Sequence, residues 1–84
     1  MTRNRHQSAL YARLRPRITT RIRDLRRAAE PLISQDKLSA LTGIHKASIS
    51  QIESGRQLPR LVQLVAISLA LNCTINDLLT ITPE

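Results

Sequence analysis

The sequence predicts an all-α fold, and three observations lead to that prediction. The chain has 84 residues, a length that suits one domain with a single hydrophobic core. Apolar residues make up 42% of the sequence, but Tyr11 is its one aromatic residue, so the core must consist of aliphatic side chains. These residues recur at helical spacing within short segments that are bounded by Gly, Pro or Asn. We therefore expect a small helical bundle.

The first predicted helix covers residues 17–29. Its apolar side chains share one face, while the other faces carry mostly Arg and Thr; the apolar residues are Ile18, Ile22, Leu25 and Ala29. We expect the helix to end before Pro31, because proline has no N–H to donate and its ring collides with the preceding turn. Pro16 separates this domain, residues 16–84, from a basic N-terminal arm, residues 1–15, that we expect to be either helical or disordered.

The second predicted helix covers residues 35–42 and has signals at both ends. Ser34 is a good N-cap, since its hydroxyl can accept a hydrogen bond from a backbone N–H of the first turn. Gly43 suits the left-handed conformation that commonly follows a helix. We expect this helix to bury Leu38 and Leu41.

The third predicted helix covers residues 46–54. His45 stands at its N-cap, and Gly55 again provides the stop. The helical period directs Ile49 and Ile52 toward the core.

These two short helices in tandem predict a helix-turn-helix. Helices of this length are marginal alone in water, so they must be held by packing. Gly43 permits the sharp reversal between them, and Ile44 is expected to fill the inside of the corner.

Two further helices are expected after Pro59. The first is strongly apolar, runs to Asn72 and contains Leu61, Leu64, Val65, Ile67 and Leu71. The second covers residues 75–79, with Thr74 as its N-cap and Leu78 as its anchor in the core.

The net charge of +7 is confined to one part of the chain. Residues 1–30 contain nine Arg and two acidic residues, whereas residues 31–84 contain four basic and four acidic residues. An Arg-rich segment favours a polyanionic partner, and nucleic acid is the most common one. An anionic membrane and an acidic protein surface are the lesser alternatives.

Several classes of function are disfavoured by the composition. Cys73 is the only cysteine, so it has no disulfide partner, and we expect it to pack as a small apolar residue. His6 and His45 lack metal-ligand spacing, and two glycines do not make a phosphate-binding loop. No apolar run approaches the ~20 residues of a membrane span. We therefore expect a cytoplasmic protein that is not an enzyme and has no cofactor or metal.

From Ser34 to Leu79 the sequence resembles the helix-turn-helix class of phage repressors and Cro proteins, also called the xenobiotic-response-element class. The matching stretch is SQDKLSALTGIHKASISQIESGRQLP, followed by LVQLVAISLALNCTINDLL. The resemblance implies a compact five-helix bundle of the phage-repressor type, here with a basic N-terminal extension. It also implies that the helix at residues 46–54 enters the major groove of DNA.

The polar face of that helix lies opposite Ile49 and Ile52. We expect its side chains to contact bases; they are Lys46, Ala47, Ser50 and Gln51. By resemblance, Lys46, Ala47 and Gln51 match base-reading positions of the family. An amide such as that of Gln51 can bond an adenine edge through two hydrogen bonds, and Lys46 can donate to guanine.

Contacts to DNA phosphates are expected from other side chains. The resemblance places Gln35 and Ser48 at phosphate-contacting positions. Arg56 and Arg60 flank the loop before the apolar helix, and we expect them to bind phosphates rather than to remain only solvated. Arg60 is the candidate for reaching toward a minor groove.

Arg26 and Glu53 are expected to serve the fold. The resemblance pairs an Arg of the first helix with the Glu of the third in a partly buried ion pair. Loss of either partner would then weaken DNA binding without removing a DNA contact.

The sequence as a whole predicts a sequence-specific DNA-binding transcriptional regulator. A repressor that binds a two-fold operator as a homodimer is the simplest form, because one helix-turn-helix reads only a few base pairs. A prokaryotic cell is the expected setting, and a phage or plasmid circuit fits the family.

Two alternatives remain open at this stage. The first alternative is the antitoxin of a toxin–antitoxin pair that also binds its own promoter, with the toxin as protein partner. The second alternative is binding of RNA, or of nucleic acid non-specifically, by the basic arm, although the lack of stacking aromatics disfavours single strands. The arm itself can follow phosphates, enter a groove, or offer Leu10, Tyr11 and Leu14 to a dimer contact.

Overall fold

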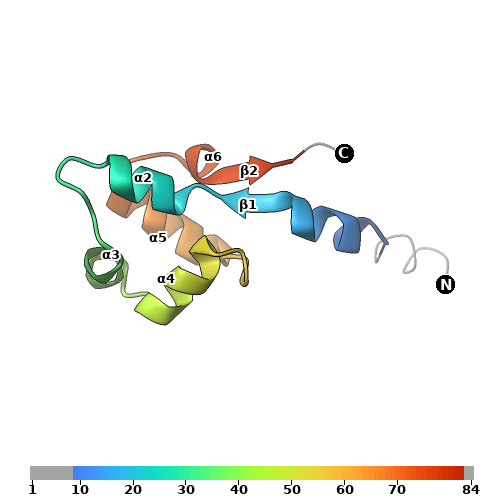
Figure 1. Cartoon of the computed structure of the whole chain (residues 1–84), viewed down its shortest axis with the longest axis horizontal. Helices are drawn as coiled ribbons and strands as arrows, with labels where there is room; N and C mark the ends of the chain where they lie inside the picture. Colours follow the sequence, from blue (N-terminus) through green and yellow to red (C-terminus); the bar gives the residue numbers. More distant parts are fainter. Residues whose placement is uncertain (1–8, 83–84) are drawn as a thin grey trace.

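The computed structural model describes residues 9–82. Five helices form a compact bundle (Figure 1): α2 (Ile22–Ala28), α3 (Gln35–Thr42), α4 (Lys46–Glu53), α5 (Leu61–Leu71) and α6 (Ile75–Leu78). Helix α3 packs against both α4 and α5, and α5 also contacts α2 and α6. This arrangement confirms the all-α prediction and the five-helix bundle.

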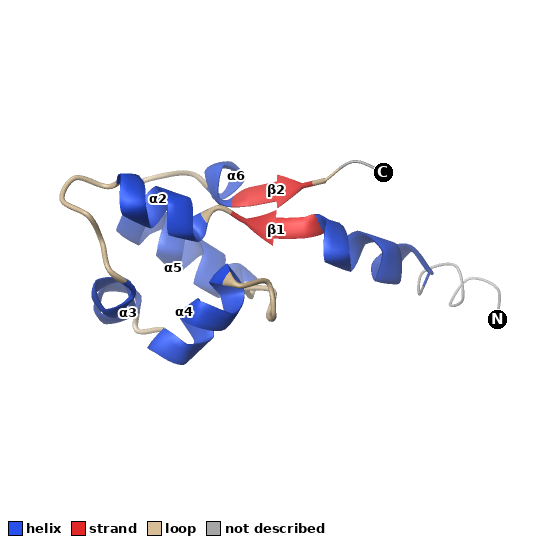
Figure 2. Cartoon of the chain, in the orientation of Figure 1, coloured by secondary structure: helices blue, strands red, loops and turns tan. Residues whose placement is uncertain are grey.

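A two-stranded sheet, which the sequence analysis does not predict, extends from one side of the bundle (Figure 2). Strand β1 (Ile18–Thr20) pairs antiparallel with β2 (Leu79–Ile81), so that Ile18 lies opposite Ile81. The N–H of Arg21 donates to the carbonyl of Leu78 at 2.8 Å and continues the pairing toward the bundle. The two ends of the folded domain are therefore joined side by side.

The predicted helix over residues 17–29 is consequently wrong in its first part. Residues Arg15–Arg17 form a 3₁₀ turn, η1, and the α-helix begins only at Ile22. The segment between them begins with Ile-Thr-Thr, three β-branched residues that favour an extended backbone, and a distant strand supplies their hydrogen-bond partners. The last helix also ends at Leu78, one residue early, because Leu79 begins β2.

The N-terminal arm lies partly outside the described residues. Residues 1–8 are not described, whereas residues 9–14 are helical and continue the chain away from the bundle beyond β1 (Figure 1). Leu10 and Tyr11 are exposed there, and Leu14 is half-buried.

The core is aliphatic, as the composition requires. Its buried side chains come from all five helices: Ile22, Leu38, Ile49, Ile52, Leu64, Ile67 and Leu78. Cys73 packs against this core, where burial, followed by the negative charge of Asp77, raises the pKa of its thiol. Leu41, expected to be buried, is 52% exposed, because α3 turns its Leu38 side toward α4 and α5 and leaves Leu41 at the edge.

Most helix ends follow the local signals in the sequence. The Ser34 hydroxyl accepts a hydrogen bond from the N–H of Lys37 at 3.0 Å. Gly43, Gly55 and Asn72 have φ angles of 79°, 84° and 55°, the left-handed region expected after a helix. His45 makes no side-chain cap, and α4 ends at Glu53, with Ser54 as its C-cap.

Candidate nucleic-acid interface

Helices α3 and α4 and the turn between them form the helix-turn-helix. The corner is fixed by hydroxyl groups: Ser39 Oγ donates to the carbonyl of Ile44 at 2.6 Å, and the N–H of Ile44 donates to Thr42 Oγ1 at 3.2 Å. A Cβ atom at Gly43 would meet no heavy atom within 4 Å. Glycine is therefore needed here for its positive φ and not for space.

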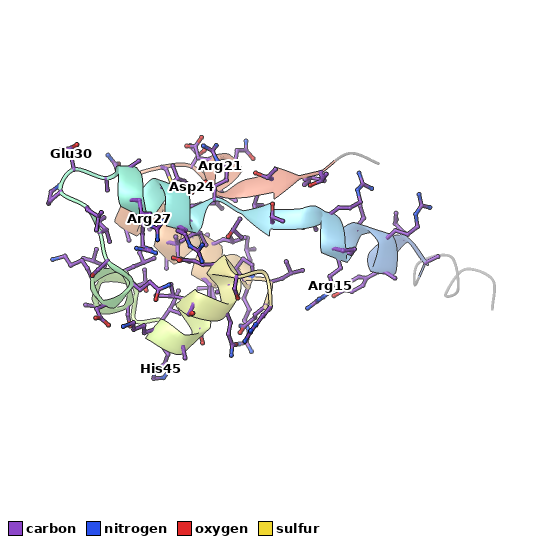
Figure 3. The ribbon with its side chains drawn as sticks, in the orientation of Figure 1. Arg15, Arg21, Asp24, Arg27, Glu30 and His45 are labelled. Atoms are coloured by element: carbon purple, nitrogen blue, oxygen red, sulfur yellow. The ribbon has the colours of Figure 1, made fainter. Side chains whose placement is uncertain are left out.

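The outer face of α4 is exposed and polar. Ile49 and Ile52 are 1% exposed on the inner side of this helix. The residues expected to contact bases all lie exposed on the other side: Lys46, Ala47, Ser50 and Gln51. Figure 3 shows His45 at the outer end of the same helix, pointing away from the bundle. The fold therefore brings the predicted base-contacting residues together on one accessible surface.

Lys46 has a local partner on the neighbouring helix. Its Nζ lies 3.2 Å from Oδ1 of Asp36, and the two side chains are 56% and 77% exposed. Ion pairs this exposed contribute little to stability, so the lysine can exchange this carboxylate for another acceptor at small cost.

The residues expected to contact phosphates lie at the starts of α3 and α4 and in the loop that follows α4. Arg56 and Arg60 are exposed in the loop between α4 and α5, and Ser48 is half-buried in the first turn of α4. Gln35, at the start of α3, is also half-buried, and its Nε2 donates to Oε1 of Glu53 at 3.0 Å. Its side chain is therefore held in place by the end of the other helix.

Arg26 and Glu53 form a two-pronged ion pair between α2 and α4. Arg26 Nε donates to Oε2 of Glu53 at 2.7 Å, and Arg26 Nη2 donates to Oε1 at 2.8 Å. The third nitrogen, Nη1, donates to the carbonyl of Ile33 at 3.0 Å. The arginine side chain is 7% exposed and the glutamate side chain 0%. The pair fixes the last turn of α4 to the first helix of the bundle.

The charge on Glu53 is stabilised by its neighbours. Burial by itself raises the pKa of a carboxyl, but hydrogen bonds from Arg26 and Gln35, with the charges of Arg26 and Arg23, lower the pKa of Glu53 below its ordinary value. The hydrogen bond to Glu53 raises the pKa of Arg26, against the opposing effect of burial. Both groups are therefore charged at neutral pH.

Sequence reasoning missed two contributors to this cluster. The sequence predicts a phosphate contact for Gln35 but not its hydrogen bond to Glu53. The sequence predicts no role for Arg23, yet its Nε lies 3.6 Å from Oε1 of Glu53. No spacing rule connects these residues, because they meet only once α2, α3 and α4 are packed.

Other kinds of site find no support within residues 9–82. This part of the chain contains no cluster of three His, Cys, Asp or Glu side chains that could hold a metal ion. None of its helices is long and apolar enough to cross a membrane.

Comparison with known proteins points to the same motif. Residues 22–78 match a protein-family model described as helix-turn-helix. The match runs from the first residue of α2 to the last residue of α6 and covers about two thirds of the 84 residues. No match is found among curated proteins.

Proposed function

The chain belongs to the helix-turn-helix family of the phage-repressor and Cro type and is a DNA-binding transcriptional regulator, and we propose that it is a cytoplasmic repressor that reads its operator through α4. The family is one of DNA-binding regulators and not of enzymes. The observation that carries the proposal is the exposed polar face of α4, a helix whose last turn is joined to α2 by the buried pair of Arg26 and Glu53.

In this proposal α4 lies in the major groove of double-stranded DNA. Gln51 accepts from and donates to an adenine edge, Lys46 donates to guanine, and the methyl group of Ala47 contacts a thymine methyl. Ser50 supplies a further hydrogen bond to a base from the same face. The hydrogen bonds that join Glu53 of α4 to Arg26 and Gln35 support this proposal, because base discrimination depends on donors and acceptors held in register with the groove.

Phosphate contacts set the position of the helix. Gln35 and Ser48 bind the backbone near the starts of α3 and α4, where free backbone N–H groups also favour anions. Arg56 and Arg60 bind phosphates from the loop after α4. The basic arm, residues 1–15, adds charge to this binding, and in the view of Figure 3 the side chain of Arg15 projects toward the side on which α4 lies.

The regulator acts as a homodimer on a two-fold operator. One recognition helix reads too few base pairs for useful specificity, and two helices can read half-sites ~34 Å apart, about one turn of DNA. Occupancy of such a site by a small protein represses a promoter by excluding the polymerase.

The test is selection of binding sites from random duplex DNA with the full chain at near-physiological salt. Wild type is expected to enrich an inverted repeat. Gln51→Ala should lose preference at one base pair of each half-site, a loss of ~1–3 kcal/mol in discrimination. Asn76→Ala is the matched control, since it removes an exposed amide from α6. Weakening by Gln51→Ala that is equal for all sequences would refute base reading by that residue. Enrichment by wild type of no sequence would refute specific recognition.

A further inference from the structure

Asp36 is an acidic side chain beside the surface that the proposed function turns toward DNA. It is the second residue of α3, and its side chain is 77% exposed. Its Oδ1 lies 3.2 Å from Nζ of Lys46, the first residue of α4 and one of the proposed base-contacting residues. Phosphates repel a carboxylate, so an acidic group at this place calls for a partner other than the DNA backbone.

The two side chains present opposite hydrogen-bonding groups next to each other. The ammonium of Lys46 can only donate, and the carboxylate of Asp36 can only accept. In the major groove a G·C base pair presents the complementary pattern, because guanine O6 accepts and the cytosine N4 amine donates. O6 and N4 are joined by a Watson–Crick hydrogen bond, so they lie about 2.9 Å apart. The 3.2 Å between Nζ and Oδ1 matches this separation.

We propose that Asp36 and Lys46 together read one G·C base pair, in which Lys46 donates to guanine O6 and Asp36 accepts from the cytosine N4 amine. The inference rests on the proposed function, since it adds a specificity-determining residue from α3 to the face of α4 that contacts bases. Both groups gain a partner on the DNA without giving up each other.

The carboxylate also limits what Lys46 can bind. Lysine is a compact charge that binds any phosphate, and phosphate contacts carry no sequence information. Asp36 neutralises this charge and repels phosphates, which directs the lysine toward a base. The charge balance of the chain agrees, because residues 31–84 contain four basic and four acidic residues and the excess of Arg lies in residues 1–30.

A purely structural role for Asp36 is weaker but can be measured. The Lys46 side chain is 56% exposed, and an ion pair between two groups this exposed adds little to stability. A carboxylate in the first turn of a helix also interacts favourably with the helix dipole. Asp24 has this second role in the first turn of α2, where it is exposed. It therefore provides a matched control for effects of the dipole and of total charge.

The first test compares Asp36→Ala and Asp24→Ala in the full chain, both shown by circular dichroism to be folded. Binding to a selected operator is measured with each of the four base pairs at the position where Lys46→Ala loses preference. Asp36→Ala should lower the preference for G·C there about tenfold. It should also raise affinity for a random duplex roughly threefold and increase the salt slope by about 1, since Lys46 becomes free to bind a phosphate. Asp24→Ala should leave the preference for G·C unchanged.

The second test changes the DNA at the same position. N4-methylcytosine still pairs with guanine, but its methyl group replaces the N–H that faces the major groove. Wild type should bind the methylated operator about tenfold more weakly than the unmodified one, and Asp36→Ala should bind the two within about twofold. A role of Asp36 in stability alone would not make the effect of the methyl group depend on this side chain.

The outcomes separate this inference from the proposed function. If wild type selects an operator, an unchanged G·C preference in Asp36→Ala would overturn the inference and leave the proposed function standing. An equal effect of N4-methylation on wild type and Asp36→Ala would do the same, as would a preference for another base pair at the position that Lys46 contacts. Enrichment of no sequence by wild type would refute the proposed function and this inference with it.

Discussion

Replacement of Glu53 by glutamine should strongly destabilise the protein, because it leaves a buried cation without its counter-charge. The side chain of Arg26 is 7% exposed, and both of its hydrogen bonds to Glu53 are short, at 2.7 and 2.8 Å. Breaking such a pair from one side costs ~3–5 kcal/mol. A chain of 84 residues has a total unfolding free energy of about 4–12 kcal/mol, so the loss is a large share of it.

The assay is urea unfolding followed by far-ultraviolet circular dichroism. With an m-value of about 1 kcal/mol/M for a small protein, the urea midpoint of the variant should lie roughly 3 M or more below that of wild type. If the unfolding free energy of wild type is smaller than this loss, the variant will be unfolded even without urea. Asp36→Asn is the control, because it removes an ion pair whose side chains are 56% and 77% exposed, and it should cost about 1 kcal/mol or less. The double variant Arg26→Met, Glu53→Leu should be more stable than Glu53→Gln, since it buries no unpaired charge. A loss in Glu53→Gln no larger than that in Asp36→Asn would refute this reasoning.

Three further predictions follow from the same structure. The pKa of Glu53 is lower in the folded state than in the unfolded state, so its contribution to stability is complete above the unfolded pKa and is lost as pH falls through the folded pKa. Urea midpoints of wild type, measured from neutral to acid pH, should show this loss. An equal dependence of the midpoint on acid pH in Glu53→Gln would contradict the prediction. Gly43→Ala should lower the unfolding free energy by ~1–2 kcal/mol, because Gly43 has a φ of 79°. Gly43→Asn should lower it less, since Asn72 already adopts the left-handed region. Equal urea midpoints for wild type and the alanine variant would contradict the prediction. Deletion of residues 2–15 should reduce the slope of log affinity for DNA against log salt concentration by an amount that corresponds to several phosphate contacts. An unchanged slope would show that the arm does not contact DNA.

The parts of the fold that sequence reasoning predicts are those determined by neighbouring residues. Ser34 and Gly43 set the two ends of α3 through the conformations and hydrogen bonds of single residues. Ile49 and Ile52 orient α4, because their spacing alone decides which face turns inward.

The parts that sequence reasoning misses depend on packing between distant segments. In the sequence, Ile18 of β1 continues the apolar spacing of the following helix. Strand β2, about 60 residues later, provides the hydrogen bonds that hold β1 extended. Leu41 fits the helical pattern of α3, yet the directions from which α4 and α5 approach leave it exposed. The bond from Gln35 to Glu53 likewise arises from the way in which α3 and α4 cross.

The pairing of β1 with β2 has a practical consequence for any engineered form of this protein. Because Ile18 lies opposite Ile81, a purification tag or fluorescent fusion at the C-terminus emerges beside the Arg-rich N-terminal segment. An acidic tag placed there would act as a tethered competitor of DNA for that segment. Glu30, in the connection between α2 and α3, lies at the opposite end of the molecule in Figure 3. A label attached in this connection is therefore expected to interfere less with the Arg-rich segment.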